Sequence, residues 1–213
     1  MEKIYIIGAS GFGREIAWLI GNLSDWETAG FIDDNVNLIN SDINGIPVKG
    51  DIDYLLSLKS EINAFIAIGN PKIRKKIYDK LKNKKNIIFP NIIDKNIQVD
   101  DSNKIGIGNI LCAGTILTTN ITLGDFNHIN LSCTIGHDVI FNDFITIYPS
   151  VNISGSVKIE SFSEIGTGSQ IIQGKLIGSN VTIGAGSVVV KNLLDAGTYV
   201  GSPAKLIKKG MIK

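Results

Sequence analysis

The chain has few of the residues that build metal centres, redox sites and disulfides. Its 213 residues include only two cysteines, two histidines and two tryptophans. Cys112 and Cys133 have neither a metal-ligand spacing nor a redox motif. We interpret them as free thiols of a protein in the reducing cytoplasm, and we expect no bound metal.

Excess charge and long apolar runs are also missing. Lys plus Arg number 21 and Asp plus Glu number 20, so the formal net charge is +1 and no bulk field favours nucleic acid or an anionic membrane. The basic run from Lys72 to Lys85, which includes Arg74, has the spacing of a solvated helix face. No stretch is long enough to span a bilayer, and the amino terminus lacks an apolar signal segment.

The chain does contain a hydrophobic residue at every sixth position over nearly half its length. All seventeen positions from Ile93 to Val189, in steps of six and including Val99, carry an aliphatic residue or phenylalanine. Neither a helix nor simple strand alternation gives an unbroken period of six. A triangular coil with three six-residue faces does, because each face directs one large apolar side chain inward. The pattern predicts a left-handed parallel β-helix made of hexapeptide repeats.

The position four residues further along each hexad agrees with this fold, because it is mostly small or β-branched and fits a corner. With eighteen residues per coil, residues 93 to 190 would form roughly five coils stacked about 4.8 Å apart. Each residue would then lie directly above or below the one eighteen positions away. The small or branched positions are Thr115, Ile121, Cys133, Val139, Ile145, Val151, Val157, Ser163, Ser169, Val181 and Ser187, and Cys133 is interpreted as filler among them.

Residues 3 to 90 follow a different pattern, in which strand and helix signals alternate. Alternation of this kind implies a small parallel sheet. The region is too short for a six-stranded dinucleotide fold, so an α/β half-Rossmann-like domain suited to a mononucleotide is predicted. Phe89-Pro90 marks its end and divides the chain into 1–90 and 91–213. The expected strands are 3–7, 28–32 and 62–68, and the expected helices are 13–20, 52–58 and 71–81.

The turn after the first strand is rich in glycine and reads Gly8-Ala-Ser-Gly-Phe-Gly-Arg-Glu15. Such glycines let backbone amides approach phosphate oxygens, and the amino end of a helix favours an anion. The spacing differs from the G-x-G-x-x-G of dinucleotide sites, so NAD is not expected. Asp33-Asp34 and Gly69-Asn70 follow the next two strands. Because ligands of α/β sheets bind at the carboxyl ends of parallel strands, three such turns favour a nucleotide site over tight turns alone.

Two histidines are the candidates for acid–base chemistry on the β-helix. His137 lies two positions past a core isoleucine, so it faces outward, and Asp138 follows it. A carboxylate can fix the imidazole tautomer and support its positive charge if the hexad corner turns the two side chains together. Gly155, eighteen residues on, would stack over His137 and expose an amide for an oxyanion. His137 is therefore favoured as the base over His128, which follows Asn127 at a corner.

Four segments, together with the hexads, make the chain similar to a known family: the glycine turn 8–15, Cys133-Thr-Ile-Gly-His-Asp138, Pro149-Ser-Val-Asn-Ile-Ser-Gly155 and Val200-Gly-Ser-Pro-Ala-Lys205. They resemble the sugar acetyltransferases of the sialic acid O-acetyltransferase and bacillosamine or perosamine N-acetyltransferase group. The resemblance covers almost the whole chain. It implies a homotrimer with acetyl-CoA in clefts between adjacent β-helices and a nucleotide-linked sugar on the amino-terminal domain.

The resemblance also implies roles for particular residues. His137 would be the general base and Asp138 would orient it. Thr146 stands where some relatives have another histidine that touches the cofactor. The cofactor channel would be lined by Gly155, Gly166, Gly184 and Ala185 and closed by Pro203 and Ala204. The sugar nucleotide would meet Gly11, Gly13 and Arg14 with its phosphates, Asp33 with its base or ribose, and Gly69 and Asn70 at its sugar end.

Three functions are alternatives to N-acetylation of a nucleotide-linked amino sugar. A γ-type carbonic anhydrase shares the β-helix but needs three histidine ligands, and the chain has two histidines. O-acetylation of a sialic acid would use the same base on a hydroxyl group. A scaffold with a nucleotide-sensing head would leave the His-Asp pair without a use. N-acetylation is favoured because three strand-end turns suit a nucleoside diphosphate and an amine attacks a thioester more readily than a hydroxyl does. The sequence specifies neither the sugar nor the nucleotide.

Overall fold

The computed structural model describes residues 1–210. The chain forms two compact units, Met1–Ile92 and Ile93–Lys213, which we call the α/β unit and the prism. The border lies two residues beyond the one expected at residue 90, and residues 211–213 of the expected second domain lie outside the described part of the chain. None of the helices formed by residues 1–210 has the length and apolar character needed to cross a membrane.

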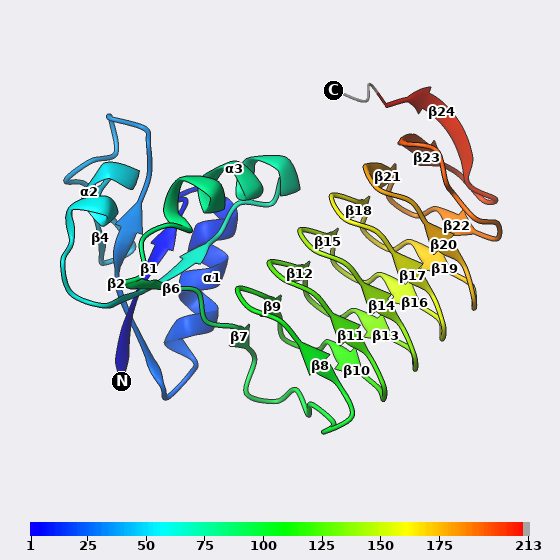
Figure 1. Ribbon diagram of the computed structural model, residues 1–213, viewed down its shortest axis with the longest axis horizontal. Helices are drawn as coiled ribbons and strands as arrows, with labels where there is room; N and C mark the ends of the chain where they lie inside the picture. The colour runs from blue at the N-terminus through cyan, green and yellow to red at the C-terminus, as the bar shows by residue number, and fades with distance from the viewer. Residues whose placement is uncertain (211–213) are drawn as a thin grey trace. The chain divides into compact units, whose positions relative to one another are not determined.

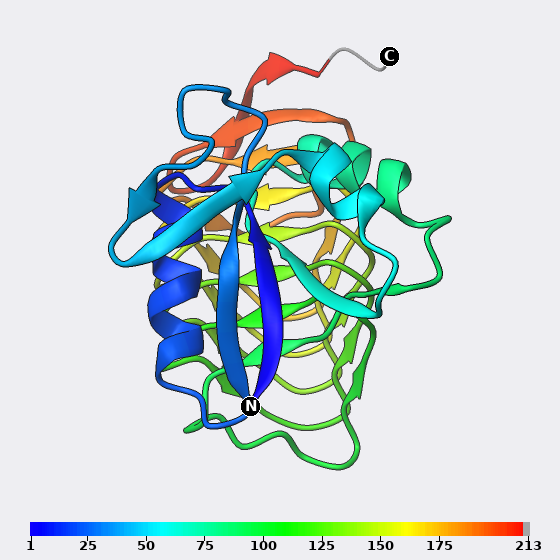
Figure 2. The same ribbon diagram turned by 90° about the vertical axis from the view of Figure 1, so that its left-hand side faces the viewer.

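The α/β unit is built on a six-stranded sheet with the order β3-β4-β2-β1-β5-β6. Its strand pairs are parallel except for the β3–β4 hairpin, and Figure 2 shows β1 and β2 side by side. Parallel strands need crossover connections, and a helix supplies the one between β1 and β2 and the one between β5 and β6. The strands are β1 (Glu2–Ile7), β2 (Trp26–Ile32), β3 (Asp42–Ile43), β4 (Ile46–Gly50), β5 (Ile62–Ile66) and β6 (Ile87–Ile88); the helices are α1 (Gly11–Gly21), α2 (Ile52–Ser57) and α3 (Pro71–Leu81).

Every element expected in this unit is present, with ends that differ by two residues or fewer. The β3–β4 hairpin and β6 are missing from the expected pattern. The available signal was Asn44-Gly45, because this pair forms the tight turn with positive φ angles of 55° and 82°. Pro47 obscured the second strand of the hairpin, since proline argues against a strand interior.

The basic run is solvated at its lysines but not at its arginine. Lys72 and Lys76 of α3 are exposed, whereas Arg74 has no exposed surface at all. The expectation that Arg74 belongs to a solvated face is therefore wrong. The buried residues of α3 are Pro71, Arg74 and Leu81, and their three- and seven-residue spacings place Arg74 on the side of the helix that packs inward.

The prism consists of short parallel strands stacked in sheets, as the coils in Figure 1 show. The first sheet contains β8 (Lys104–Ile105), β11 (Thr122–Leu123), β14 (Ile140–Phe141), β17 (Lys158–Ile159) and β20 (Leu176–Ile177). The second contains β10 (Ile116–Leu117), β13 (Thr134–Ile135), β16 (Asn152–Ile153), β19 (Gln170–Ile171) and β22 (Val188–Val189). The third contains β7 (Ile92–Ile93), β9 (Ile110–Leu111), β12 (His128–Ile129), β15 (Thr146–Ile147), β18 (Glu164–Ile165), β21 (Val181–Ile183), β23 (Gly197–Val200) and β24 (Lys205–Lys209).

The eighteen-residue register holds through the stack. Leu117 pairs with Ile135, which pairs with Ile153, and the second hexad positions are all at most 4% exposed. Every sixth residue from Gly108 to Gly186 has a positive φ, and these residues turn the corners between sheets. The predicted left-handed parallel β-helix following an α/β domain is thus confirmed.

The regular stack begins later than expected. Val99 is 38% exposed and lies in the segment 94–103, which contains no strand, so it is not a core residue. Two aspartates fold this segment locally: Asp94 accepts a hydrogen bond from Asn96 N–H at 2.9 Å, and Asp100 accepts one from Ser102 N–H at 3.0 Å. Side-chain bonds of this kind compete with strand pairing.

Candidate active site

His137 and Asp138 form a hydrogen-bonded pair on the edge of the prism between β13 and β14. The distance from His137 Nδ1 to Asp138 Oδ2 is 2.8 Å, and the two side chains are 52% and 53% exposed. Neighbours on a straight strand point in opposite directions, but Asp138 has a φ of 60° and turns its side chain toward the imidazole. The expected pairing at a corner is confirmed. With Nδ1–H donating to the carboxylate, Nε2 is the nitrogen left to accept a proton.

Gly155 lies against the imidazole of His137, as the eighteen-residue register predicts. A Cβ at position 155 would be 2.5 Å from both Cε1 and Nε2 of His137, so a larger residue would displace the ring. The expected stacking is confirmed. Gly155 is itself buried, however, so the ring occupies the space that was expected to leave its amide accessible.

His128 does not lie at a corner. It belongs to strand β12, and it is only 1% exposed within the chain. Its Cα is paired with those of Ile110 and Thr146 in the neighbouring coils. Of the two histidines, only His137 presents its ring to solvent.

The residues expected to line the cofactor channel lie on two different edges of the prism. Gly155 shares the edge of His137, after β16. Gly166 and Gly184 follow β18 and β21 in the third sheet, and so does Ala185, on the edge that leads to the second sheet. A Cβ at Gly166 would lie 2.6 Å from Ala185 N, and one at Gly184 would lie 2.6 Å from Val200 Cγ1. One chain therefore does not bring these two groups together. The close stacking of neighbouring coils is by itself a reason for glycine at positions 166 and 184.

The remaining cofactor candidates differ in how much surface they offer. Thr146 lies on β15 and is only 3% exposed. Pro203 is exposed in the turn between β23 and β24, and Ala204 N–H donates to Val188 O at 2.8 Å at the end of the stack. Thr146 is thus the candidate with the least surface available to a ligand.

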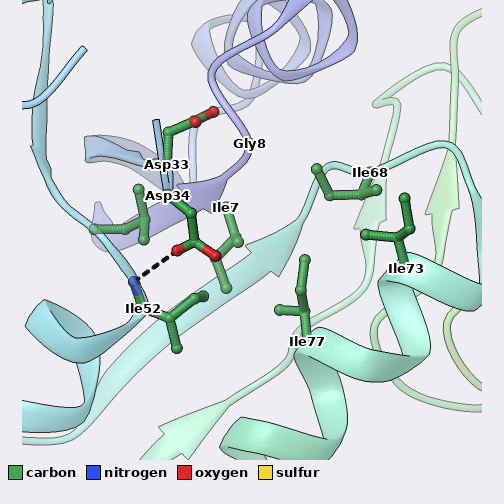
Figure 3. A pocket seen from close by; sticks show the side chains of 9 residues that line it. Ile7, Gly8, Asp33, Asp34, Ile52, Ile68, Ile73 and Ile77 are labelled. Carbon is green, nitrogen blue, oxygen red and sulfur yellow. Dashed lines mark hydrogen bonds between the residues drawn. The ribbon is translucent and has the colours of Figure 1, made fainter. Parts of the chain in front are cut away.

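The α/β unit contains a cavity of about 180 Å³ at the carboxyl ends of its parallel strands. Figure 3 shows its side chains, which come from the ends of β1 and β2, the segment after β5, and helices α2 and α3. The cavity is lined by Ile7, Gly8, Ile32, Asp33, Asp34, Ile52, Ile68, Ile73 and Ile77. The expected convergence of strand-end turns is therefore present, and its walls are mainly isoleucine.

The glycines of the first turn have different tasks. A Cβ at Gly13 would lie 1.9 Å from Gly8 O, so Gly13 is required for the packing of α1 against the turn. Gly11 is exposed, and the only neighbour of a Cβ there would be Arg14 at 4.0 Å. Arg14 is also exposed, the first turn of α1 has no acidic residue, and Ser10 does not cap it through its side chain. Gly11 and Arg14 thus remain open to an anion, whereas Gly13 has a structural reason of its own.

Asp33 is committed to the turns around it. Its Oδ2 accepts a hydrogen bond from Ala9 N–H at 2.8 Å, and its Oδ1 accepts one from Asn35 N–H at 2.9 Å. Asp34, whose turn was expected at the site but which was given no role of its own, lines the same cavity. The doubled aspartate after β2 predicted the turn, but not which of its two carboxylates is free of backbone donors at closer range.

Asn70 and Arg74 shape the segment after β5. The Asn70 side chain caps α3 by accepting hydrogen bonds from Lys72 N–H at 3.1 Å and Ile73 N–H at 3.0 Å. The Arg74 guanidinium donates to Ile68 O at 2.7 Å and to Gly69 O at 3.1 Å. A Cβ at Gly69 would meet no atom within 4 Å, so this position is open. The sequence did not indicate that Arg74 is buried at this site, because the lysines around it have the spacing of a solvated face.

Cys133 has the surroundings of a core residue. It is fully buried, and its Sγ lies 3.3 Å from Tyr148 O. Burial raises the pKa of its thiol to about 11, so the thiolate needed by a nucleophile is absent at neutral pH. No group of three His, Cys, Asp or Glu side chains suited to a metal ion occurs within residues 1–210.

A β-helix with a His–Asp pair on one edge, following an α/β unit with a strand-end cavity, defines the class of hexapeptide-repeat acyltransferases. Residues 3–81 match the PglD N-terminal domain. The GDP-perosamine N-acetyltransferase of Escherichia coli O157:H7 is 30% identical over 226 residues, covering 98% of each chain. The chain belongs to this family of sugar N-acetyltransferases and is an acetyltransferase, which confirms the resemblance seen in its motifs.

Two solved structures extend the comparison over the whole fold. The acetyltransferase domain of PglB from Neisseria gonorrhoeae FA1090, in complex with acetyl coenzyme A, is 32% identical with a TM-score of 0.89, covering 97% of this chain and 99% of that chain. PerB from Caulobacter crescentus, in complex with CoA and GDP-perosamine, is 27% identical with a TM-score of 0.87, covering 99% and 98%. Each of these two comparisons therefore covers both units of the chain.

Proposed function

We propose that this protein transfers the acetyl group of acetyl-CoA to the amino group of a nucleotide-linked amino sugar, as a step of surface-glycan biosynthesis. The observation that carries the proposal is the His137–Asp138 pair, whose carboxylate holds Nδ1 and leaves Nε2 for the proton. The full-length relative that acts on GDP-perosamine supports an amine as the acceptor. Two buried free thiols support the cytoplasm as the compartment.

His137 acts as the general base in this proposal. The sugar ammonium must lose a proton before its nitrogen can attack, and His137 Nε2 takes that proton directly or through a water molecule. The nitrogen forms a bond to the thioester carbonyl carbon and loses its second proton to solvent, the carbon–sulfur bond breaks, and the CoA thiolate recovers the first proton from the imidazolium. The base contributes about 10²- to 10⁴-fold to the rate acceleration, and the positioning of two bound substrates contributes much of the remainder.

The site is proposed to form between copies of the chain in a homotrimer. His137 and Gly155 lie on one edge of the prism, whereas Gly166, Gly184 and Ala185 lie on another. A second copy that presents its other edge to His137 would bring both groups to one molecule of acetyl-CoA. Pro203 and Ala204 would then close the end of this channel, and Thr146 would contact it only after a movement that exposes it.

The α/β unit is proposed to hold the nucleotide. Gly11 and Arg14 meet the phosphates, since both are exposed beside the uncapped amino end of α1. Gly13 and Asp33 form the turn that carries them, and Asp33 contacts the ligand only through a carboxylate that already accepts two backbone amides. Gly69 and Asn70 flank the sugar end.

A product-mass assay tests the proposal. The purified protein is incubated with acetyl-CoA and a panel of UDP-, GDP-, dTDP- and CMP-linked sugars with and without a free amine. A gain of one acetyl group on an amino sugar, stable to mild alkali as an amide is, supports it. Acetate release by mild alkali from a product whose substrate lacks an amine would overturn it in favour of O-acetylation.

A further inference from the structure

The corner residue Asp138 belongs to a ladder of hydrogen bonds along the edge of the prism between its second and first sheets. At three successive corners, the N–H of the corner residue donates to a carbonyl oxygen of the coil before it. These bonds join Gly174 N–H to Gly155 O at 3.0 Å, Ser156 N–H to His137 O at 2.8 Å and Asp138 N–H to Thr119 O at 3.1 Å. Asp138 has a φ of 60°, a conformation that costs a non-glycine residue free energy and persists where its surroundings fix it. The ladder therefore helps to hold Asp138 in the conformation that directs its carboxylate to His137.

The ladder ends on a side chain instead of a backbone carbonyl. Asn120 is the corner residue of the coil before Asp138, and the same interval would place the carbonyl of residue 101 below its N–H. The segment 94–103 contains no strand, and Figure 1 shows it as an irregular stretch between β7 and β8. Ser102 Oγ takes the place of the missing carbonyl and accepts a hydrogen bond from Asn120 N–H at 2.8 Å. Ser102 is therefore the lower end of the ladder that includes Asp138.

Asp100 holds Ser102 in place. Its Oδ1 accepts hydrogen bonds from Ser102 N–H, at 3.0 Å, and from the Ser102 hydroxyl, and these bonds lower the pKa of the Asp100 carboxyl below its ordinary value. An ionised carboxylate only accepts, so the Ser102 proton points to Asp100 and Ser102 Oγ is left to accept from the Thr119 hydroxyl, 2.9 Å away. The residue whose carbonyl receives Asp138 N–H is thus tied to Ser102 through its side chain as well.

Building on the proposed function, in which His137 is the base and Asp138 orients it, we propose that Ser102 is a positioning residue of the acetyl-transfer reaction. Ser102 anchors the ladder of corners, so that Asp138 keeps its carboxylate against Nδ1 of His137. It touches none of the reacting atoms and acts through Thr119 and Asp138. The departure of residues 94–103 from the repeat then has a use, because it supplies a fixed acceptor where the coils end.

Steady-state kinetics of the full-length protein test this inference. We expect Ser102→Ala to lower kcat by about three- to tenfold and to leave the KM for acetyl-CoA within about twofold, because the oriented base is needed for the chemical step. The melting temperature should change little, since Ser102, Thr119 and Asn120 are exposed and water can replace the lost bonds. Ser102→Thr keeps the hydroxyl and should retain kcat within about twofold. Wild-type kcat in Ser102→Ala, or an equal loss in Ser102→Thr, would overturn the inference.

Ser161→Ala is the matched control. Ser161 Oγ accepts a hydrogen bond from Asp143 N–H at 3.2 Å across the same eighteen-residue interval, but on the edge between the first and third sheets. The variant loses the same kind of bond and should keep the wild-type kcat. Equal losses of kcat in Ser161→Ala and Ser102→Ala would overturn the inference, because any broken bond between coils would then have this effect.

A double-mutant cycle shows whether Ser102 acts through Asp138. In the Asp138→Asn background, Ser102→Ala should lower kcat by less than about twofold further, because the route to the imidazole is already broken. Fully additive losses would overturn the inference. Hydrogen exchange without substrate gives a second measurement: the amides of Asn120 and Asp138 should exchange faster in Ser102→Ala and not in Ser161→Ala, and unchanged exchange would overturn the inference. Failure of the proposed function is distinguishable, because an ester product would overturn the amine acceptor while the coupling of Ser102 to Asp138 is measured on the same base.

Discussion

Gly155 of the prism and Gly13 of the α/β unit are both glycines because a Cβ would collide with a neighbour, but the neighbours differ in kind. At Gly155 the colliding group is the imidazole of His137, 2.5 Å away, which is a side chain that can move. At Gly13 it is the carbonyl oxygen of Gly8, 1.9 Å away, which is backbone. The same residue type thus makes room for a side chain in one region and for the backbone in the other.

The two contacts also differ in how they can be located from the sequence. In the prism a single interval of eighteen residues connects Gly155 to His137, because parallel pairing repeats in each coil. In the α/β unit no such interval exists, and the contacts of Gly13 follow from how one helix meets one turn. In a repeat, the neighbour of each residue can therefore be calculated from the sequence. In a fold without repeats, the sequence predicts only which residues lie near the ends of the strands.

Separating the two regions should give the largest effect. A fragment that begins at Asn91 keeps every strand of the regular stack, so we expect it to bind acetyl-CoA within about threefold of the intact protein and to lose nucleotide-sugar binding and transfer completely. Calorimetric titration with both ligands measures this. In the intact chain, Gly13→Ala should act in the same direction through its backbone collision. Retained sugar affinity in both would show that the nucleotide does not bind the α/β unit.

Removing the imidazole should give the next largest effect. We expect His137→Ala to reduce turnover by about 10²- to 10⁴-fold with little change in acetyl-CoA affinity, because the side chain is half exposed and lies outside the apolar stack. Steady-state kinetics and a thermal melt measure the two quantities. Lys158→Ala, at an exposed position of β17, is the surface control and should change neither. Turnover near the wild-type rate would remove His137 from the mechanism.

The fold could be predicted further than the site because period and alternation determine the fold. The hexads predict the stack, the second buried positions and the contact of His137 with Gly155, and these follow from repeated parallel pairing. Val99 satisfies the period but is excluded from the core by the local turns of Asp94 and Asp100. Period alone cannot reveal such competition.

Residues of the α/β unit were harder to assign individually. The strand-end turns predict where the cavity lies, but not that Asp33 is occupied by backbone amides while Asp34 faces the cavity. Arg74 shows the same limit, because a charged residue within a basic run gives no sign that it is buried against the carbonyls of Ile68 and Gly69. These assignments depend on the direction of each side chain, and in an irregular turn no repeating pattern of the sequence predicts that direction.

Crowding the imidazole tests whether the prism separates chemistry from stability. Gly155→Ala should lower turnover by about tenfold or more because the ring must move, with only a small loss of thermal stability. Gly124→Ala is the matched variant, since its Cβ would meet the Asp143 side chain and also lie 2.9 Å from the backbone oxygen of Asn142, and it should lower stability instead. Comparing turnover with melting temperature in the two variants decides this. Equal losses of stability would show that Gly155 is an ordinary packing position.

Neutralising the partner of the imidazole should cost less than removing the imidazole. Asp138→Asn keeps the size of the side chain and the corner backbone, but loses the charge that supports the imidazolium, so we expect roughly a tenfold loss of turnover. Steady-state kinetics of Asp138→Asn and His137→Ala, measured side by side, compare the two losses. A loss as large as that of His137→Ala would show that the roles of the two residues have been assigned the wrong way round.

The smallest effect is expected at Cys133, which occupies the second hexad position and is fully buried, as is Val151 in the next coil. Cys133→Val places a side chain of similar size beside Val151, so activity should be unchanged and the free energy of unfolding at pH 7 should change by less than about 1.5 kcal/mol.

Burial raises the pKa of the native thiol from 9.0 to about 11. The unfolded chain therefore ionises first, and the wild type should lose stability as pH rises from about 9 to about 11, by roughly 3 kcal/mol. Urea unfolding at pH 7, 9 and 10.5 measures this loss, which should be smaller in the variant by the contribution of that thiol. Identical alkaline losses in both proteins would show that the Cys133 thiol is already solvated, and lost activity in Cys133→Val would bring it back as a participant in the chemistry.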